Sequence, residues 1–381
     1  MTMARANFRS RMAGMSLMEI LIAMAIGLIG IVVITQTYLV NENYKRSTAS
    51  AGGAQTSGAL ALYTIERDAR MAGWGIAWSS VLGCPGLRWY HSPDGYSVLA
   101  GGTLPTIVPA PVVITDGAGG PDTVTVLYGT GTERVIPATL SATQVSPGDP
   151  LQVDNPEGFS ANPGDIILAV QGNLCSLMQI TSTASGQLAH VAGVNAPYNP
   201  ASGGTLPAYP AGAQVFNLGR PVLNVYSVEN PDRRHLQLAS LFTAASSTVV
   251  PSYTPTAFPL IENIVDLQAQ YGKDNGVDNG TVANALFVAN DGIVDSYDNV
   301  TPTDALGWQQ VLSIRMGVLA RSEHYVKPSA GVCEATTALP VWSGSAQAGS
   351  AFTVPGGIPS CYGYRVFETV VPLRNMIWRQ G

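Results

Sequence analysis

The sequence predicts an α+β fold in which a long N-terminal hydrophobic α-helix packs on a large antiparallel, β-rich C-terminal head. Three observations predict this fold. An uninterrupted apolar run extends from Ile20 to Ile34, close to the start of the chain. Residues 59–72 then place apolar side chains at helical spacing. The rest of the 381 residues alternates short β-like runs with glycine and proline, which together number 41 + 26 = 67.

Composition and charge agree with such a head and argue against other classes of protein. Charged residues make up only 12% of the chain, about half the usual share for a soluble globular protein. The net charge of −6 argues against nucleic-acid binding, which normally requires a basic surface. The four histidines, His91, His190, His235 and His324, lie far apart in the sequence. Histidine-based chemistry is therefore not favoured.

The start of the chain predicts a membrane helix with a basic cytoplasmic flank. Residues 1–14 contain three arginines and no acid. The run Ile20–Ile34 has no charged or hydrogen-bonding side chain, and the apolar residues just before it extend the stretch to about twenty residues. At ~1.5 Å of rise per residue this gives roughly 30 Å of helix, the thickness of a bilayer's hydrocarbon core. The arginines predict that everything after about Tyr38 lies outside the cytoplasm.

Two simple interpretations of this segment leave features unexplained. A cleaved secretory signal needs small residues soon after the apolar core, and residues 35–40 (Thr-Gln-Thr-Tyr-Leu-Val) do not supply them. A plain membrane anchor fits the length but does not explain Glu19. A carboxylate within an apolar helix costs ~3 kcal/mol or more in lipid, and it normally indicates a specific partner.

Gly14 followed by the apolar Met15, with Glu19 at the fifth position after the glycine, resembles the class III leader of type IV prepilins and pseudopilins. The resemblance implies a type IV pilin-like fold, a leader peptide at 1–14, cleavage after Gly14 by a prepilin peptidase, and N-methylation of Met15. The family usually has Phe where this chain has Met15. It also implies that Glu19 is the assembly acid, which neutralises the terminal amine of a neighbouring subunit. Such a pair fixes register, because either charge alone in an apolar bundle is costly.

Residues 15–75 are expected to form the transmembrane assembly helix and its amphipathic extension. The Gly52-Gly53 pair predicts a weak point or break, since each glycine costs roughly 1 kcal/mol relative to alanine. Gly73 and Gly75 are expected to end the helix. The segment 65–75 (Ile-Glu-Arg-Asp-Ala-Arg-Met-Ala-Gly-Trp-Gly) is similar to the segment that closes the first helix of PilW-type minor pilins. It is less closely similar to J-type pseudopilins of type II secretion.

The head is expected to consist of a β-rich region, 76–255, and a C-terminal half, 256–381, with a soft boundary near residue 255. The clearest predicted strands are 123–128, 165–170, 222–228 and 235–241, and long Gly/Ser/Pro-rich loops are expected at 193–213 and 343–360. Three blocks of the C-terminal half again resemble the PilW family: 261–272, 308–322 and 364–375. Residues 80–255 carry no such resemblance.

The chain has four cysteines, Cys84, Cys175, Cys333 and Cys361, and no C-x-x-C pair. Zinc-binding and thioredoxin-like sites are therefore not favoured. A head outside the cytoplasm favours two disulfides. Of the three connectivities, the order in the chain favours Cys84–Cys175 and Cys333–Cys361, because each pair closes one module. Buried free thiols are the alternative, and the sequence does not decide between them.

The Asp/Asn/Gly-rich segment 273–298 is the best candidate for a ligand site. Its carboxylates lie in predicted tight turns and are of the type that Ca²⁺ prefers: Asp274, Asp278, Asp291, Asp295 and Asp298. The EF-hand pattern fails, because the third position from Asp274 is Gly276 and no Glu stands at the twelfth. Solvated turn residues are the alternative interpretation.

No G-x-S-x-G, H-E-x-x-H or P-loop motif and no Cys/His cluster is present, so the chain is not expected to be an enzyme or to require a cofactor.

The resemblance implies a minor pilin that assembles or initiates a type IV pilus at its tip, supporting adhesion and twitching motility. The alternative is a J-type minor pseudopilin of a type II secretion system. The implied partners are other minor and major pilins, the prepilin peptidase, the inner-membrane assembly platform and membrane lipid before assembly, and no nucleic acid. The implied location is a single inner-membrane pass with a periplasmic head, and then the extracellular fibre.

Overall fold

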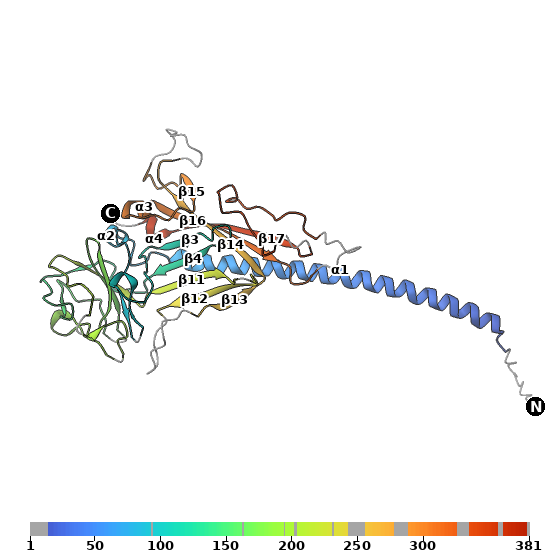
Figure 1. Cartoon of the computed structure of the whole chain (residues 1–381), viewed down its shortest axis with the longest axis horizontal. Helices are drawn as coiled ribbons and strands as arrows, with labels where there is room; N and C mark the ends of the chain where they lie inside the picture. The colour runs from blue at the N-terminus through green and yellow to red at the C-terminus, as the bar shows by residue number, and fades with distance from the viewer. Residues whose placement is uncertain are drawn as a thin grey trace, which may run out of the picture. The chain divides into compact units, whose positions relative to one another are not determined.

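The structure is a computed structural model that describes residues 14–378 except 93, 162–163, 194, 202–203, 231, 243–255, 278–288, 326–334 and 357–360. The chain divides into two compact units, Met1–Gly52 and Gly53–Gly381. Their relative placement is not determined, and each unit is treated by itself (Figure 1).

One helix, α1 (Leu17–Met71), contains 55 residues, and the boundary between the two units falls inside it. Figure 1 shows it as one continuous coil. The break expected at Gly52-Gly53 is therefore not formed, because the chain stays helical through both glycines. The helix ends just before Gly73, which adopts a φ of 83° and confirms the predicted stop.

Two antiparallel sheets form the body of the head. Their strands are β3 (Val112–Thr115), β4 (Thr123–Tyr128), β11 (Val222–Val228), β12 (His235–Leu241), β13 (Phe258–Glu262), β14 (Ile264–Lys273), β15 (Ser296–Asp298), β16 (Val311–Arg321) and β17 (Tyr364–Pro372). The order is β13-β12-β11-β4-β3 in the five-stranded sheet and β15-β14-β16-β17 in the four-stranded sheet. The fold class predicted from the sequence is thus confirmed, as are the predicted strands 123–128, 222–228 and 235–241.

A smaller β structure, which we call the insert, lies between β4 and β11 in the chain. Its strands are β5 (Ala138–Thr139), β6 (Leu151–Gln152), β7 (Ile166–Gln171), β8 (Leu174–Gln179), β9 (Gln187–Leu188) and β10 (Gln214–Gly219). Four of them form the sheet β5-β10-β7-β8, and β6 pairs with β9. The insert has its own core, in which Ile167, Tyr209 and Val215 are fully buried. Figure 1 shows it (green) at one end of the two main sheets.

The remaining elements are short. They are α2 (Ser79–Leu82), β1 (Tyr90–His91), β2 (Gly95–Tyr96), α3 (Ala305–Gln309) and α4 (Arg374–Ile377), with 3₁₀ turns at Val98–Ala100 and Ala184–Gly186. The predicted block 261–272 corresponds to β13 and β14, which Asn263 separates with a φ of 64°. Asn tolerates this left-handed conformation better than most residues. The corner lets the chain pass from one sheet to the other.

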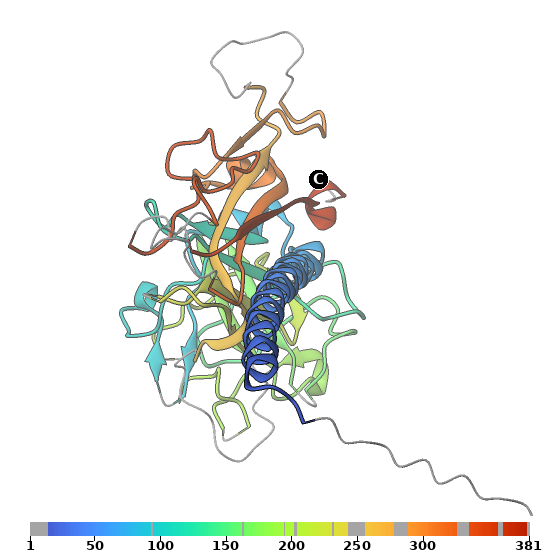
Figure 2. The same cartoon turned by 90° about the vertical axis from the view of Figure 1, so that its right-hand side faces the viewer.

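The main core lies between one stripe of α1 and both sheets. Leu62, Ile65, Ala69 and Ala72, the residues predicted at helical spacing, are all buried in it. On the same stripe Gly58 gives room to β17, since a Cβ at this position would lie 2.1 Å from a ring carbon of Phe367. Figure 2, viewed roughly along α1, shows the orange and red strands of the four-stranded sheet beside the helix.

The two halves of the head share this core. Strands β12 and β13 pair with each other across the soft boundary proposed near residue 255. The core takes Val124 and Tyr226 from before that position and Leu267 and Ile314 from after it. The distinct structural piece within 76–255 is the insert.

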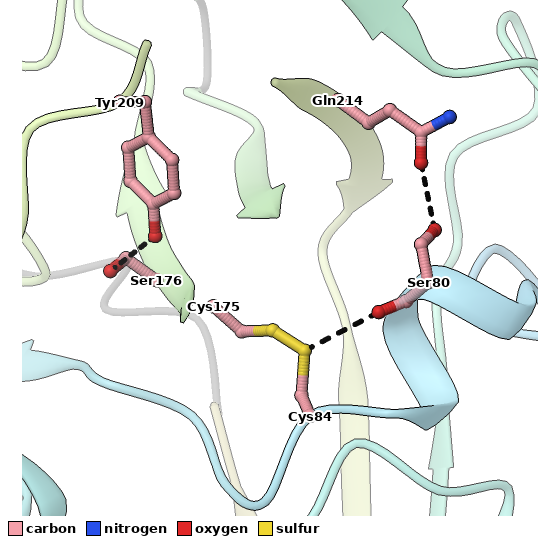
Figure 3. The surroundings of a disulfide bond; sticks show 6 residues. All are labelled: Ser80, Cys84, Cys175, Ser176, Tyr209 and Gln214. Atoms are coloured by element: carbon pink, nitrogen blue, oxygen red, sulfur yellow. Dashed lines mark hydrogen bonds between the residues drawn. A yellow bond between two sulfur atoms is a disulfide. The ribbon is translucent and has the colours of Figure 1, made fainter. Parts of the chain in front are cut away.

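A disulfide joins Cys84, in the segment after α2, to Cys175 in β8, with a Cα–Cα distance of 6.2 Å and a sequence separation of 91 (Figure 3). The first predicted pair is therefore confirmed. The backbone of Arg88 reinforces the link, because it donates to Cys175 O at 2.9 Å and accepts from Leu177 N at 3.0 Å. Cys361 is also disulfide-bonded. Its predicted partner, Cys333, lies outside the described residues, so the second pair stays a prediction.

Candidate assembly site

The start of α1 is closed by a capping box, an arrangement in which two side chains satisfy the first backbone amides of a helix. Ser16 Oγ accepts from Met18 N at 3.2 Å, and Glu19 Oε2 accepts from Ser16 N at 3.0 Å. The pattern Ser-x-x-Glu at 16–19 is the sequence signature of such a cap. This signature is readable in the sequence and marks Ser16 as the residue before the first helical turn. It places the Glu19 carboxylate at the N-terminal end of the helix, next to the proposed cleavage point.

The first part of α1 is apolar on every side. Every large apolar side chain from Met15 to Ile34 is exposed. Glu19 is the only charged residue between Met15 and Asn41. Within the described residues, α1 is the one helix that is long and apolar enough to cross a membrane. A helix that is apolar all round needs lipid or other helices around it.

Cleavage after Gly14 would create an α-amine at Met15, one residue before the Ser16 amide that Glu19 already faces. Met15 and Glu19 lie four positions apart, so this amine would lie about one helical turn from the Glu19 carboxylate. Helix capping is worth about 1 kcal/mol. A lone ionised group in an apolar bundle costs several times more. Capping alone therefore does not offset the cost of an ionised Glu19 in apolar surroundings.

The far end of α1 is fixed to the head by a buried carboxylate. Asp68 is 3% exposed, and its Oδ2 accepts from Asn224 Nδ2 at 2.5 Å and from the Tyr226 hydroxyl at 2.6 Å, both in β11. Burial, followed by the hydrogen bond to Asp68, raises the pKa of Tyr226. Breaking such a buried network by removing one partner is costly. Asp68 belongs to the segment 65–75 on which the resemblance to PilW partly rests.

The last segment of the head holds the end of the same helix. Asn375, in α4, donates from Nδ2 to Met71 O at 3.1 Å and to Ala72 O at 2.9 Å. These carbonyls have no partner within the helix, because they belong to its last turn. The first and last elements of the head are thus joined by hydrogen bonds.

The head resembles one known protein family. Residues 225–375 match the family PilW, described as Type IV Pilus-assembly protein W. The C-terminal part of this chain is therefore similar to the PilW family. The match starts in β11, includes Tyr226 and β12–β17, and ends at Asn375, so it contains all three blocks that resemble PilW in the C-terminal half. It covers less than half of the chain and leaves out the insert. No curated protein and no solved structure matches the chain. The PilW match supports a role in type IV pilus assembly.

The described carboxylates that were predicted to bind calcium accept hydrogen bonds from groups within the same segment of the chain. Asp274 accepts from Asn290 N and Gly292 N, and Asp295 accepts from Gly276 N. Asp291 accepts from Ile293 N, and Asp298 accepts from Lys273 Nζ and Val300 N. Asp278 lies outside the described residues. Among the residues that are described, no group of three His, Cys, Asp or Glu side chains is placed to hold a metal ion. Calcium binding stays a prediction, which a melting temperature unchanged by a chelator would contradict.

A cavity of about 270 Å³ lies in the head beside β1. Its lining of Tyr90, Ser92, Ala192, Gly193, Ala196, Asn199 and Ala201 contains no His, Cys, Asp or Glu. The Asn199 amide is already engaged by Gln179 and Val191.

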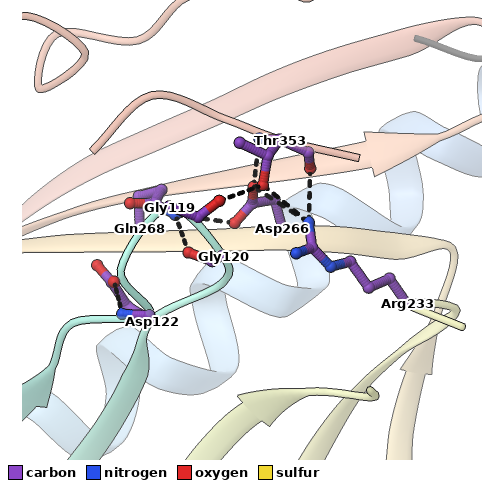
Figure 4. Close-up of polar contacts among 8 residues, drawn as sticks. Gly119, Gly120, Asp122, Arg233, Asp266, Gln268 and Thr353 are labelled. Carbon is purple, nitrogen blue, oxygen red and sulfur yellow. Dashed lines mark hydrogen bonds and ion pairs between the residues drawn. The ribbon is translucent and has the colours of Figure 1, made fainter. Parts of the chain in front are cut away.

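Two buried carboxylates lie at β14, and one of them, Asp266, holds a strap, residues 335–354, that covers the face of β14 and β16 turned away from α1. Asp266 Oδ2 accepts from Thr353 N at 2.6 Å, with Arg233 Nη1 4.0 Å away (Figure 4). Asp122 Oδ2 accepts from Ala269 N at 2.8 Å. Gln268 links the two regions by donating to Gly120 O and to Asp266 Oδ1 (Figure 4). Burial raises the pKa of both carboxyls to about 6.

This pair predicts a specific dependence of stability on pH. A folded-state pKa near 6, above the unfolded value of 3.8, means that the folded head holds these protons more tightly than the unfolded chain. Their stabilising contribution is full below pH ~4 and is lost as the pH rises through about 6. The loss is on the order of 3 kcal/mol for each carboxyl. Asp122→Asn should therefore be less destabilising at pH 7.5 than at pH 4.5, when unfolding free energies of the two proteins are compared.

The control for this experiment is Asp232→Asn, because Asp232 is largely exposed. Its effect on stability should be small and similar at both pH values. A difference between wild type and Asp122→Asn that does not change between pH 4.5 and 7.5 would contradict the raised pKa of Asp122.

Proposed function

We propose that the chain is a PilW-type minor pilin, cut after Gly14 and assembled through α1 into a type IV pilus. The proposal rests chiefly on one observation: an apolar, exposed helix segment with a single acid at its start continues as a helix that is fixed in a PilW-type head. The lipid-exposed form would exist before assembly, with the head in the periplasm. Assembly would transfer the apolar segment from lipid to the helical bundle of the fibre.

In this mechanism Glu19 and the new amine of Met15 set the register between neighbouring helices. Asp68 and Asn375 hold the end of α1 in the head, and α1 runs without a break from that end to the apolar segment. A mature chain of 367 residues (381 − 14) is large for a subunit repeated throughout a fibre. We therefore propose a place at the tip, where it helps to initiate assembly and supports adhesion and twitching motility.

Fractionation of piliated cells tests this function. The chain should be present in fibres sheared from the cell surface, in far smaller amount than the main subunit, and its deletion should reduce the number of surface fibres. Restriction of the chain to the membrane fraction of well-piliated cells would contradict the proposal. Normal piliation with loss of protein secretion on deletion would instead indicate a type II secretion pseudopilus.

A further inference from the structure

The strand β17 forms an open edge of the four-stranded sheet. Its nine residues pair on one side with β16 in a constant register, from Ser313 opposite Pro372 to Arg321 opposite Tyr364. Leu373 N donates to Leu312 O at one end of this ladder, and Ser322 N donates to Gly363 O at the other. Antiparallel pairs alternate between bonded and non-bonded positions. The odd-numbered residues of β17 therefore bond to β16, and the even-numbered ones direct their backbone groups away from the sheet.

The outward-facing amides of β17 belong to Tyr364, Val366, Glu368 and Val370. Across the described parts of the chain, none of these four N–H groups donates a hydrogen bond. Pro372 is the next outward-facing residue and has no N–H. The edge is accessible near its end, because the side chains of Glu368, Val370 and Pro372 are exposed. An open edge of this length is a template for an added strand.

The other edge strands of the main sheets are shorter than β17, with three to five residues, and are interrupted or partly covered. At β3, both backbone groups of Ile114 already have partners. Its N–H donates to the Tyr271 hydroxyl at 2.6 Å, and its carbonyl oxygen accepts from Thr301 Oγ1 at 3.0 Å, so neither can pair with an added strand. β13 contains Pro259 and pairs with β12 through a register shift. β15 has only three residues.

In the insert, the edge of β8 is occupied by the backbone of Arg88. Prolines, bulges and covering segments are the devices by which proteins prevent unwanted strand pairing. Among the described strands, the chain uses them at these edges and leaves β17 open over most of its length.

We propose that the open edge of β17 binds an extended segment from the head of another pilin subunit in the same fibre, by addition of a strand to the sheet. This inference rests on the proposed function. Phe367 of β17 packs against Gly58 of α1, so a subunit whose helix assembles beside α1 brings its head toward this side. The exposed charges of β17, Arg365 and Glu368, cancel, so recognition falls to the backbone, which favours an extended polypeptide.

Val370→Pro tests this inference because it removes one outward-facing N–H and leaves the bonds to β16 in place. The strand already accepts proline in the same orientation at Pro372, two residues further on. The matched control is Val370→Ala, which shortens the same side chain and keeps the N–H. The amount of full-length chain in sheared fibres should fall by about tenfold for Val370→Pro and by less than about twofold for Val370→Ala. The melting temperatures of the two extracted variants should agree, which shows that both are folded.

A second measurement identifies the occupant and does not depend on proline. Val370→Cys, treated in intact fibres with a thiol-to-amine crosslinker, should yield a product that reacts with antibody to another pilin of the same fibre. Val145→Cys is the control, because Val145 is 90% exposed and lies in the insert; it should yield no such product.

Each outcome separates the inference from the function on which it rests. Entry of Val370→Pro into fibres at the wild-type level, or a crosslinked product made only of two copies of this chain, would overturn the inference and leave the proposed function intact. Absence of the wild-type chain from fibres would overturn both.

Discussion

A Glu19→Ala variant should be cut after Gly14 as efficiently as the wild-type chain and should enter fibres at least about tenfold less. The reason is the unpaired charge. Without the carboxylate, the amine of Met15 on a neighbouring subunit must enter an apolar bundle alone, which costs several kcal/mol. The measurement compares the chain in sheared fibres with the chain in membranes by immunoblot, using its size to follow processing.

The capping box calls for a control, since Glu19→Ala also removes half of the helix cap. Ser16→Ala removes the other half, the hydroxyl that accepts from Met18 N. Loss of a cap costs about 1 kcal/mol of helix stability, and the bundle itself stabilises the helix, so this variant should assemble at nearly the wild-type level. Equal defects in the two variants would assign Glu19 to capping and remove it from contact between subunits.

Replacing both Cys84 and Cys175 with Ser should destabilise the head by about 4 kcal/mol, since the disulfide closes a loop of roughly 90 residues. The effect should concentrate in the insert and in the segment that follows α2, because the bond joins these two parts. Thermal melting and limited proteolysis of the full-length protein would measure it. Double replacement is preferable to treatment with a reductant, which would also act on Cys361.

Ser80→Ala is the matched control for the disulfide. Its hydroxyl donates to Gln214 Oε1 at 2.7 Å, close to the bond (Figure 3), and loss of this hydrogen bond should cost only about 1 kcal/mol. A double Ser variant that melts together with wild type would show that the insert is held by its own core instead of by the disulfide.

The parts of the fold that could be predicted from the sequence are those with a strong local pattern. Residues 222–228 and 235–241 combine β-branched and apolar residues with clear boundaries, and they form β11 and β12 at the predicted positions. The stripe Leu62, Ile65, Ala69 and Ala72 has helical spacing and lies in the core. The residues around Gly14 and Glu19 resemble the class III prepilin leader, a short motif defined by sequence spacing alone.

The parts that could not be predicted depend on distant contacts. From the sequence, Asp68 is indistinguishable from the other charged residues on the surface of the helix. Its hydrogen bond to Asn224, 156 residues later in the chain, is visible only in the structure and shows that Asp68 is buried. The sheet of the insert pairs Val215 with Ala138 across a long stretch of irregular chain, for which no periodic pattern exists. The helix through Gly52-Gly53 persists although intrinsic propensity argues against it, because a helix of this length is little affected by two weak positions.

The N-terminus of the chain recovered from sheared fibres is the most direct measurement of the account given above. Mass spectrometry of its first peptide should find a methylated Met15 as the first residue, with the carboxylate of Glu19 four positions further on. A first residue at Met1, or one beyond position 35, would leave no apolar helix with a free amine and a lone acid at its start. Either result would contradict assembly through α1.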